Sequence, residues 1–213
     1  MKLAKLKSIT PGTRHQFNLT KNLLSKQHNI LKNLSLKFFK NAGRSSVTGH
    51  VTSAHKGGGC KKKFRKIKFN SFYTKNIVLM ISLDPYRNSF ISLNFDFYSK
   101  FFFYSNTAQA IFPGAISVCQ KKKLELFFGN RSTLFNFPIG ALISNISKIS
   151  FGHELSKYSR AAGTYCQIIQ KKKQKTQIRL PSGKFILTHS NLFATFGRVS
   201  NIKINLTLLG KAG

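Results

Sequence analysis

The chain has 213 residues, with 36 lysines and arginines, four aspartates and glutamates, and a formal net charge of +32. An excess of cations on this scale indicates that an anionic partner covers much of the surface, and nucleic acid is the first candidate. An acidic membrane surface is the second candidate, although the sequence has no long amphipathic helix with a basic face. So few carboxylates argue against an enzyme of the glycosidase type, which needs two of them in one cleft.

Hydrophobic residues make up 41% of the chain, which allows a packed core and excludes a disordered basic tail. No apolar run is long enough to span a membrane, and the first residues lack the apolar centre of a secretory signal. Cys60, Cys119 and Cys166 are widely spaced and odd in number, so we expect no disulfide framework and a reducing compartment.

Residues 1–42 are expected to form a basic N-terminal extension. Pro11 and Gly12 interrupt residues 1–16, which we interpret as an extended arm. Between Leu19 and Leu36, leucine and isoleucine recur at a rough helical spacing, which predicts a short surface helix.

The stretch from Gly43 to Phe69 combines glycines with lysines and arginines and contains no acidic residue. Cations at this density repel one another, so a polyanionic partner is expected here. Glycine lets backbone N–H groups approach a phosphate or a 2′-hydroxyl group, while lysine and arginine supply charge and donors. The expected contacts to nucleic acid in this stretch are Arg44, His55, Lys56, Gly57, Gly58, Gly59, Lys61, Lys62, Lys63 and Arg65.

Short strands dominate the prediction for residues 43–114, which we expect to form one domain. Asp84-Pro85-Tyr86-Arg87-Asn88 predicts a turn, because proline fixes φ and Asp and Asn side chains bond to nearby backbone. Five short antiparallel strands in so few residues suit a Greek-key barrel such as the oligonucleotide-binding (OB) fold. The strand candidates are residues 66–72, 77–83, 90–97, 100–104 and 110–112.

Residues 115–213 are expected to form a second small barrel. Pro181-Ser182-Gly183 predicts a tight hairpin, and residues 191–196 predict a single helical turn that ends at Gly197. The strand candidates are residues 116–119, 141–146, 165–170, 176–180, 184–188 and 202–208. No linker rich in Gly, Ser or Pro separates the two units, so we expect them to share an interface.

The segment from His153 to Tyr165 has two interpretations. Lys157 and Arg160 stand just before Ala161-Ala162-Gly163, whose minimal side chains would let the backbone of a partner come close. The same residues also suit an ordinary barrel loop with a tight turn at Gly163. Composition does not choose between a partner contact and a simple turn.

Catalytic and cofactor motifs are not expected in this chain. The sequence has no GxSxG motif, and Gly57-Gly58-Gly59-Cys60-Lys61 lacks the spacing of a phosphate-binding loop. His50, His55 and Cys60 lack the paired spacing of a zinc site. We therefore predict no catalytic residue, no metal site and no cofactor.

Several short blocks occur in an order that resembles the universal "L-two" family of large-subunit ribosomal proteins. The resemblance covers nearly the whole chain and is weakest before Gly43. The blocks that carry it are Gly43-Arg44 with Gly49, His55–Gly59, Asp84–Asn88, Pro138–Gly140, Ser159–Tyr165, Arg179–Gly183, Ala194–Gly197 and Leu209–Gly213.

This resemblance implies an OB barrel followed by an SH3-like barrel, and a structural, non-enzymatic role in binding large-subunit ribosomal RNA. It implies support for subunit assembly and for the peptidyl transferase region, with other ribosomal proteins as partners and no membrane. It also implies RNA contacts for Arg87, Arg160 and the triple-glycine segment. We add Lys211 from the last block, and Lys157 from the segment that precedes Arg160.

Two departures from the family pattern stand out. Cys60 occupies a position where the family commonly has histidine, and after Gly213 the family continues into a basic tail that carries a noted histidine. We expect that tail to be lost or to be supplied by a separate chain. The many Phe and Asn residues favour an organellar protein, with a mitochondrion ahead of a plastid or a bacterial cytoplasm.

Two rival functions remain open at this point. One is a nucleic-acid enzyme with an OB domain, against which the scarcity of carboxylates argues. The other is a sequence-tolerant binder of single strands that stacks bases on phenylalanine.

Overall fold

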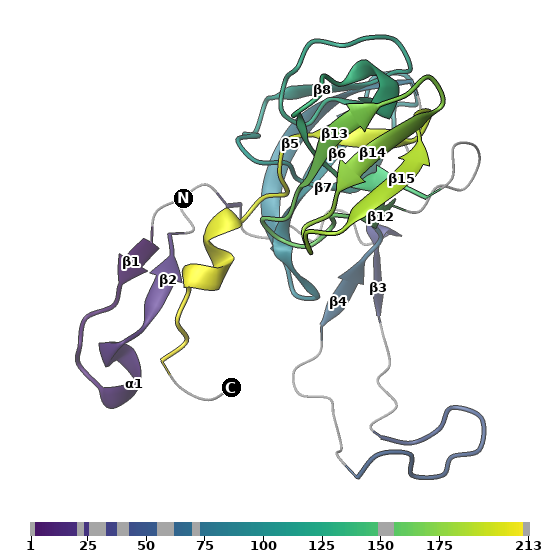
Figure 1. Cartoon of the computed structure of the whole chain (residues 1–213). Helices are drawn as coiled ribbons and strands as arrows, with labels where there is room; N and C mark the ends of the chain where they lie inside the picture. Colours follow the sequence, from purple (N-terminus) through teal and green to yellow (C-terminus); the bar gives the residue numbers. More distant parts are fainter. Residues whose placement is uncertain are drawn as a thin grey trace.

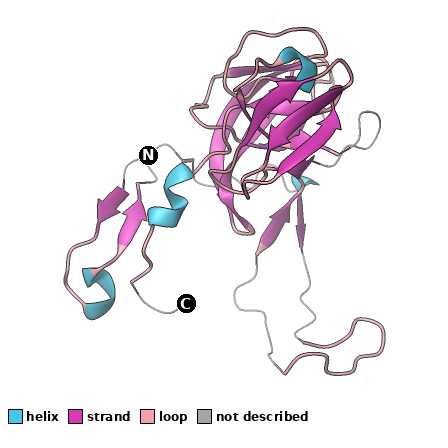
Figure 2. Ribbon diagram, viewed as in Figure 1, coloured by secondary structure: helices cyan, strands magenta, loops and turns pink. Residues whose placement is uncertain are grey.

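The computed structural model describes residues 3–20, 24–25, 33–37, 43–54, 62–69, 73–148 and 156–210. Strands dominate these residues and form a rounded body, from which two smaller parts project (Figures 1 and 2). The expected all-β class is confirmed, with an OB-type unit followed by an SH3-like unit.

The body is built on one sheet in the order β15-β14-β13-β10-β16-β9-β8-β5-β6-β7. In chain order its strands are β5 (Thr74–Asp84), β6 (Arg87–Asp96), β7 (Phe102–Asn106), β8 (Ile116–Cys119), β9 (Arg131–Thr133), β10 (Leu142–Ser144), β13 (Cys166–Lys171), β14 (Lys175–Arg179), β15 (Phe185–His189) and β16 (Phe193–Phe196).

The long β5–β6 hairpin is the centre of the first unit. Its strands pair from Asn76↔Asp96 to Asp84↔Arg87, so Pro85 and Tyr86 form the predicted turn. Two register shifts interrupt the pairing, and such irregularities increase the local twist of a hairpin. Two clusters of buried hydrophobic side chains include residues of this hairpin, one around Val78 and the other around Ile91.

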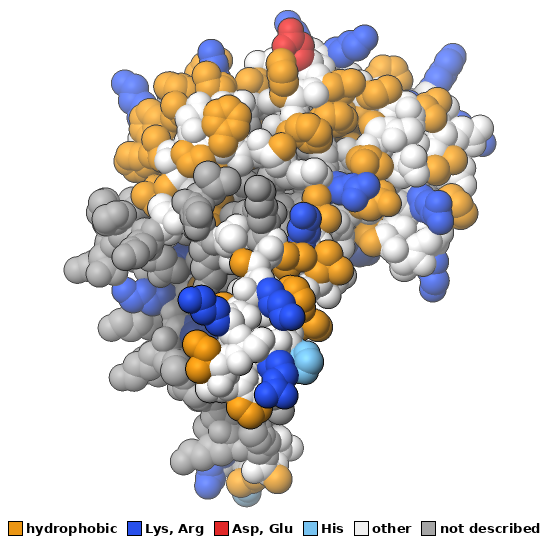
Figure 3. All heavy atoms as spheres, turned by 90° about the vertical axis from the view of Figure 1, so that its left-hand side faces the viewer, with side chains coloured by type: hydrophobic (Ala, Val, Ile, Leu, Met, Phe, Trp, Pro, Cys, Tyr) orange, Lys and Arg blue, Asp and Glu red, His pale blue; other side chains and the backbone are white. Residues whose placement is uncertain are grey.

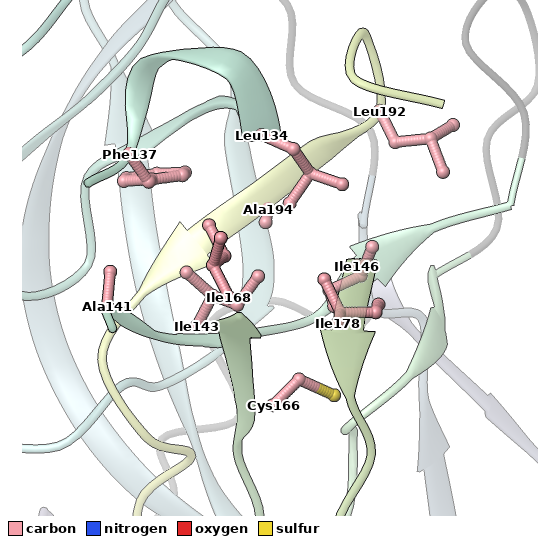
Figure 4. Packing of buried hydrophobic residues seen from close by; sticks show 10 residues of the cluster. All are labelled: Leu134, Phe137, Ala141, Ile143, Ile146, Cys166, Ile168, Ile178, Leu192 and Ala194. Carbon is pink, nitrogen blue, oxygen red and sulfur yellow. The ribbon is translucent and has the colours of Figure 1, made fainter. Parts of the chain in front are cut away.

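The second unit has the larger apolar core, which draws its members from β10, β13, β14 and β16 (Figure 4). Along β14 buried and more exposed residues alternate, so one face of this strand packs inward and the other faces solvent. The cluster consists of Leu134, Phe137, Ala141, Ile143, Ile146, Cys166, Ile168, Ile178, Leu192 and Ala194.

Strand β8 joins the two units. It pairs with β5 from Thr74↔Cys119 to Ile77↔Ile116, and with β9 at the single pair Cys119↔Arg131. By its pairing β8 therefore lies with the first unit, although the predicted boundary after residue 114 assigns it to the second. The boundaries after residues 42 and 114 stay predictions.

The first residues fold into a hairpin, where an extended arm was predicted. Strands β1 (Leu3–Lys5) and β2 (Phe17–Leu19) pair around the short helix α1 (Pro11–Arg14), which begins at the predicted break. The Phe17 N–H donates to the Leu208 carbonyl at 3.1 Å. This hydrogen bond joins the N-terminal hairpin to the C-terminal segment. The two segments lie side by side in Figure 1.

A second projection is the hairpin of β3 (Ser35–Lys37) and β4 (Lys63–Arg65) (Figure 1). The helix predicted from Leu19 to Leu36 is wrong at both ends, because Leu19 belongs to β2 and Leu36 to β3. Most of the residues between them lie outside the described part of the chain.

Three further predictions are wrong in the second half of the chain or at its border. Within residues 191–196, where a helical turn was predicted, residues 193–196 form β16, which is paired on both sides. Residues 202–206 form the 3₁₀ helix η3 (Ile202–Leu206), where a strand was predicted. Residues 110–112 are a turn and coil, where a strand was predicted.

The remaining elements are β11 (Ile146–Ser147), β12 (Ser156–Tyr158) and η2 (Leu134–Asn136).

Candidate nucleic-acid interface

The buried carboxylate of Asp84 faces two arginines at the end of the β5–β6 hairpin. Arg65 Nη1 lies 3.4 Å from Asp84 Oδ1, and Arg87 Nε lies 2.7 Å from Oδ2. The Asp84 side chain is 0% exposed, so both cations offset the cost of burying its charge. The turn predicted from the sequence is thus held by a small network of charges.

The two arginines differ in exposure, and this corrects the prediction for Arg65. Its side chain is only 5% exposed and also donates from Nη1 to the Leu83 carbonyl. Arg65 therefore stabilises the hairpin from inside and does not face a partner. Arg87 keeps 26% of its side chain exposed, so it can hold Asp84 and still present donors at the surface.

A cavity of about 730 Å³ opens beside this turn. Lys62 and Lys63 from β4 and the preceding coil line it together with Arg87. The N-terminal hairpin and the C-terminal segment also line it, with Asn18 and Asn201. Predicted contact residues from two separate parts of the sequence therefore line one cavity, whose walls also include apolar residues such as Leu24, Leu83 and Phe90.

The loop from Ser159 to Thr164 is fixed by hydrogen bonds to its neighbours. Asn106 Nδ2 donates to the Arg160 carbonyl at 3.1 Å, and Thr164 Oγ1 donates to the Ala161 carbonyl at 2.7 Å. Gly163, at φ +71°, donates its N–H to the Ser200 carbonyl at 3.0 Å. The backbone is held while the Arg160 side chain is exposed, which suits a preorganised contact.

The segment Ser200-Asn201 connects this loop to the Asp84–Asn88 turn. Asn201 Nδ2 donates to the Asn88 carbonyl at 2.7 Å, and Ser200 Oγ accepts the Phe90 N–H at 3.0 Å. Strand β6 begins at Arg87 and its antiparallel neighbour β7 ends at Asn106, so both arginine loops lie at the same end of the sheet. We call this the arginine end.

The projecting hairpin adds cations beyond the arginine end. Arg44 is exposed and its Nη1 donates to the Gly49 carbonyl at 3.2 Å, across a bridge between Arg44 and Val51. Lys62 and Lys63 are exposed as well. The other residues predicted in this region, His55, Lys56, Gly57, Gly58, Gly59 and Lys61, lie outside the described residues, as does Lys211.

Two family models match the chain. "Ribosomal Proteins L2, RNA binding N-terminal domain" matches residues 31–115, and "Ribosomal Proteins L2, C-terminal domain" matches residues 128–213. The chain belongs to the ribosomal protein L2 family. It is 35% identical to large ribosomal subunit protein uL2c of Psilotum nudum over 220 residues, which cover 100% of this chain and 76% of that protein.

A second relative is large ribosomal subunit protein uL2m of Reclinomonas americana, 34% identical over 216 residues, with 100% of this chain and 76% of that protein covered. As a member of the L2 family, the chain is a structural constituent of the large ribosomal subunit. Arg44, Lys62, Lys63 and Arg87 fall within the match to the RNA-binding N-terminal domain, and Arg160 within the match to the C-terminal domain.

The L2-family surface described here is strongly cationic. Of the acidic residues that the structure describes, Asp84 and Asp96 are buried and Glu125 is exposed. On the face shown in Figure 3, Lys and Arg side chains are spread over the body and the projecting part, with one acidic group at the top. Such a surface attracts phosphates over distances of about a Debye length, roughly 8 Å at physiological salt.

Two basic side chains were not predicted to have their observed environments. The Arg198 guanidinium lies 4.3 Å from the centroid of the Tyr165 ring, a cation–π contact between residues far apart in the sequence. Lys171 Nζ donates to the Phe135 carbonyl at 2.8 Å, and burial lowers the pKa of this amine. Lys157, which was predicted as a contact, is exposed, with Nζ 5.2 Å from the centroid of the Tyr158 ring.

A metal-binding cluster and a membrane-spanning helix are both absent from the described part of the chain. These residues hold no group of three or more His, Cys, Asp or Glu side chains that could bind a metal ion. In the same part of the chain, no helix has the length and apolar character needed to cross a membrane.

Proposed function

We propose that the chain binds large-subunit ribosomal RNA through its arginine end and its basic projecting hairpin. The observation that carries this proposal is the link through Ser200-Asn201, which brings the Arg87 turn and the Arg160 loop to one end of the sheet. Lys62 and Lys63 extend the same surface along the cavity wall. The role is structural, and catalysis is left to the RNA and to other components.

The proposed mode of recognition is contact with the shape of folded RNA. Lysine supplies a point charge for a phosphate, whereas arginine supplies a planar fork that can bind a phosphate with two hydrogen bonds. Folded RNA is read mostly through phosphates, 2′-hydroxyl groups and shape. The proposed contacts are Arg44, His55, Lys56, Gly57, Gly58, Gly59, Lys61, Lys62, Lys63, Arg87, Lys157, Arg160 and Lys211, and Arg65 is withdrawn from the set because it is buried.

We further propose that the chain works in an organellar ribosome, and specifically in a mitochondrial one. Organellar members of the family are among its relatives, at 34% and 35% identity, which supports the compartment class. The chain has 21 phenylalanines and no tryptophan, a composition that suits a divergent protein encoded in an organelle. Such divergence favours a mitochondrion over a plastid.

Its place in the subunit follows from the family. We propose that it supports assembly and the region around the peptidyl transferase centre, beside other ribosomal proteins. A separate chain that supplies the basic C-terminal tail of the family stays a prediction.

Quantitative mass spectrometry of purified organellar large subunits tests this function. The expected result is one copy of the chain per subunit, retained after a high-salt wash. The same data set is searched for a second chain with the sequence of the tail. Absence of the chain from purified subunits would contradict the proposed function.

A further inference from the structure

The turn between β6 and β7 exposes an unusual number of aromatic side chains. Phe97 is 45% exposed, Tyr98 68%, Phe101 73% and Phe102 44%. We call residues 97–102 the aromatic turn. Exposed apolar patches of this kind on soluble proteins commonly mark sites of association. No RNA contact proposed above uses these residues.

Asp96 holds the aromatic turn in a defined conformation. Its Oδ1 accepts the Tyr98 N–H at 3.2 Å and its Oδ2 accepts the Ser99 hydroxyl at 2.6 Å. The Asp96 carbonyl accepts the Lys100 N–H at 2.9 Å, and Lys100 adopts a left-handed φ of 58°. Since Asp96 is only 1% exposed, its charge serves the turn, which is ordered before any partner arrives.

The aromatic turn lies at the opposite end of the sheet from the arginine end. Strand β6 runs 10 residues from Arg87 to Asp96, and ten residues of strand span about 30 Å. The two ends are therefore separate contact regions. A partner at the aromatic turn is distinct from the RNA contacts proposed for Arg87 and Arg160.

The ring geometry favours a protein over RNA bases at this turn. Phe95 and Phe97 have ring centroids 6.0 Å apart and planes inclined by 81°, and Phe95 and Phe102 lie 5.1 Å apart at 48°. Rings inclined in this way form a continuous, uneven apolar patch, whereas bases stack on flat faces that are presented in parallel. Aromatic residues inside a polar rim are typical of protein interfaces.

Charge around the patch indicates the chemistry of that protein. Lys75 and Lys100 are exposed beside the aromatic rings, and the nearest carboxylate in the fold, Asp96, is buried within the turn. We propose that the aromatic turn docks a neighbouring protein of the same subunit, through an apolar contact on that protein ringed by aspartate or glutamate. This partner class rests on the proposed ribosomal function.

Site-specific photo-cross-linking in reconstituted large subunits tests the proposal. A benzophenone side chain is placed at Phe101, and a second one at Val47, which is 90% exposed on the basic projection. The Phe101 adduct should resist ribonuclease, be destroyed by protease, and map to an apolar peptide flanked by carboxylates. An adduct to RNA at Phe101, or no adduct, would overturn the inference. The Val47 adduct should contain RNA, and its failure would count against the proposed function alone.

A pair of substitutions makes the same test without a cross-linker. Tyr98→Ser with Phe101→Ser removes two exposed rings, and Phe185→Ser with Leu187→Ser on the edge strand β15 is the matched control. The first pair should lower the occupancy of the cross-linked neighbour in the subunit about tenfold or more, because central aromatic residues dominate interface energies. Affinity for ribosomal RNA should stay within about twofold in both pairs. Unchanged occupancy in the first pair would overturn the inference.

Discussion

Asn201 donates a 2.7 Å side-chain hydrogen bond to the backbone carbonyl of Asn88, directly after Arg87. Asn201 itself adopts a left-handed φ of 63°, a conformation that asparagine tolerates better than most residues. The residue therefore does two things at once. Its left-handed backbone conformation precedes the first residue of η3, and its side chain fixes the turn that carries Arg87.

Replacing Asn201 should separate these two contributions. Asn201→Gly keeps access to the left-handed conformation and removes the hydrogen bond, which costs about 1 kcal/mol of unfolding free energy. Asn201→Ala removes the bond and adds backbone strain, so the loss should be larger, about 2 kcal/mol. Urea unfolding of the isolated chain measures both values. Equal stability of the alanine variant and the parent chain would count against this role.

Replacement of Arg65 by alanine should cost more stability than replacement of Arg87. Loss of Arg65 leaves the buried Asp84 carboxylate with one partner fewer, and removal of one member of a buried ion pair costs about 3 kcal/mol. Arg87→Ala should lower stability less, because this side chain is partly exposed.

The same two variants should differ in RNA affinity. At temperatures where both are folded, Arg87→Ala should bind ribosomal RNA more weakly and Arg65→Ala should bind like the parent chain. Filter binding alongside circular dichroism makes the comparison. A stable Arg65→Ala protein that has lost RNA binding would refute the assignment of Arg65 as an internal residue.

Gly163 is the position in the Arg160 loop where a side chain should be harmful. It has φ +71°, and an added Cβ would lie 3.1 Å from the Ile202 Cα. Gly183 in the β14–β15 turn is a matched control, since it has φ +86° but open space at its Cβ position. Gly163→Ala should therefore cost more stability than Gly183→Ala, whose loss of about 1 kcal/mol comes from strain alone. Thermal unfolding tests the difference, and equal losses would argue against close packing of this loop on η3.

The Cys166 thiol should react slowly with alkylating reagents in the folded protein. Burial raises the pKa of its thiol from 9.0 to about 11, and a hydrogen bond with Ser159 offsets part of that rise. The folded state thus favours the protonated thiol, so the stabilising contribution is complete below the unfolded pKa and is lost as the pH rises toward 11.

Alkylation measures this shift directly. In a Cys60→Ser, Cys119→Ser background, iodoacetamide should modify Cys166 slowly at pH 8 and increasingly fast toward pH 11, whereas urea should restore ordinary thiol reactivity at pH 8. A native rate profile with a midpoint near 8.5 would contradict the inferred environment.

Local turn chemistry made part of this fold predictable. Asp84-Pro85 encodes the β5–β6 turn, and Pro181-Ser182-Gly183 encodes the β14–β15 turn, so both hairpins follow from neighbouring residues. The secondary-structure predictions failed where contacts with segments distant in the sequence determine the conformation. Residues 193–196 become a strand because β9 and β10 pair with them on both sides, which no local pattern reveals.

The alternation of residues 202–206 predicted a strand, but Asn201 turns the chain into the left-handed region and η3 packs beside β2. The same limit applied to the candidate site. Arg65 and Arg87 look equivalent in the sequence, and only the position of Asp84 shows that one is internal. Grouping of Arg87 with Arg160 depends on the Ser200-Asn201 link between segments far apart in the chain.

The central claim is that the arginine end binds folded ribosomal RNA. The most direct measurement is the affinity of the chain for large-subunit ribosomal RNA as a function of salt, with Arg87→Ala, Arg160→Ala and, as a control, Lys184→Ala in the exposed β14–β15 turn. Each arginine variant should bind more weakly and reduce the salt slope by about one, while the control changes neither much. Unchanged affinity and slope for both arginine variants, or equally tight binding of generic single-stranded RNA, would contradict the account.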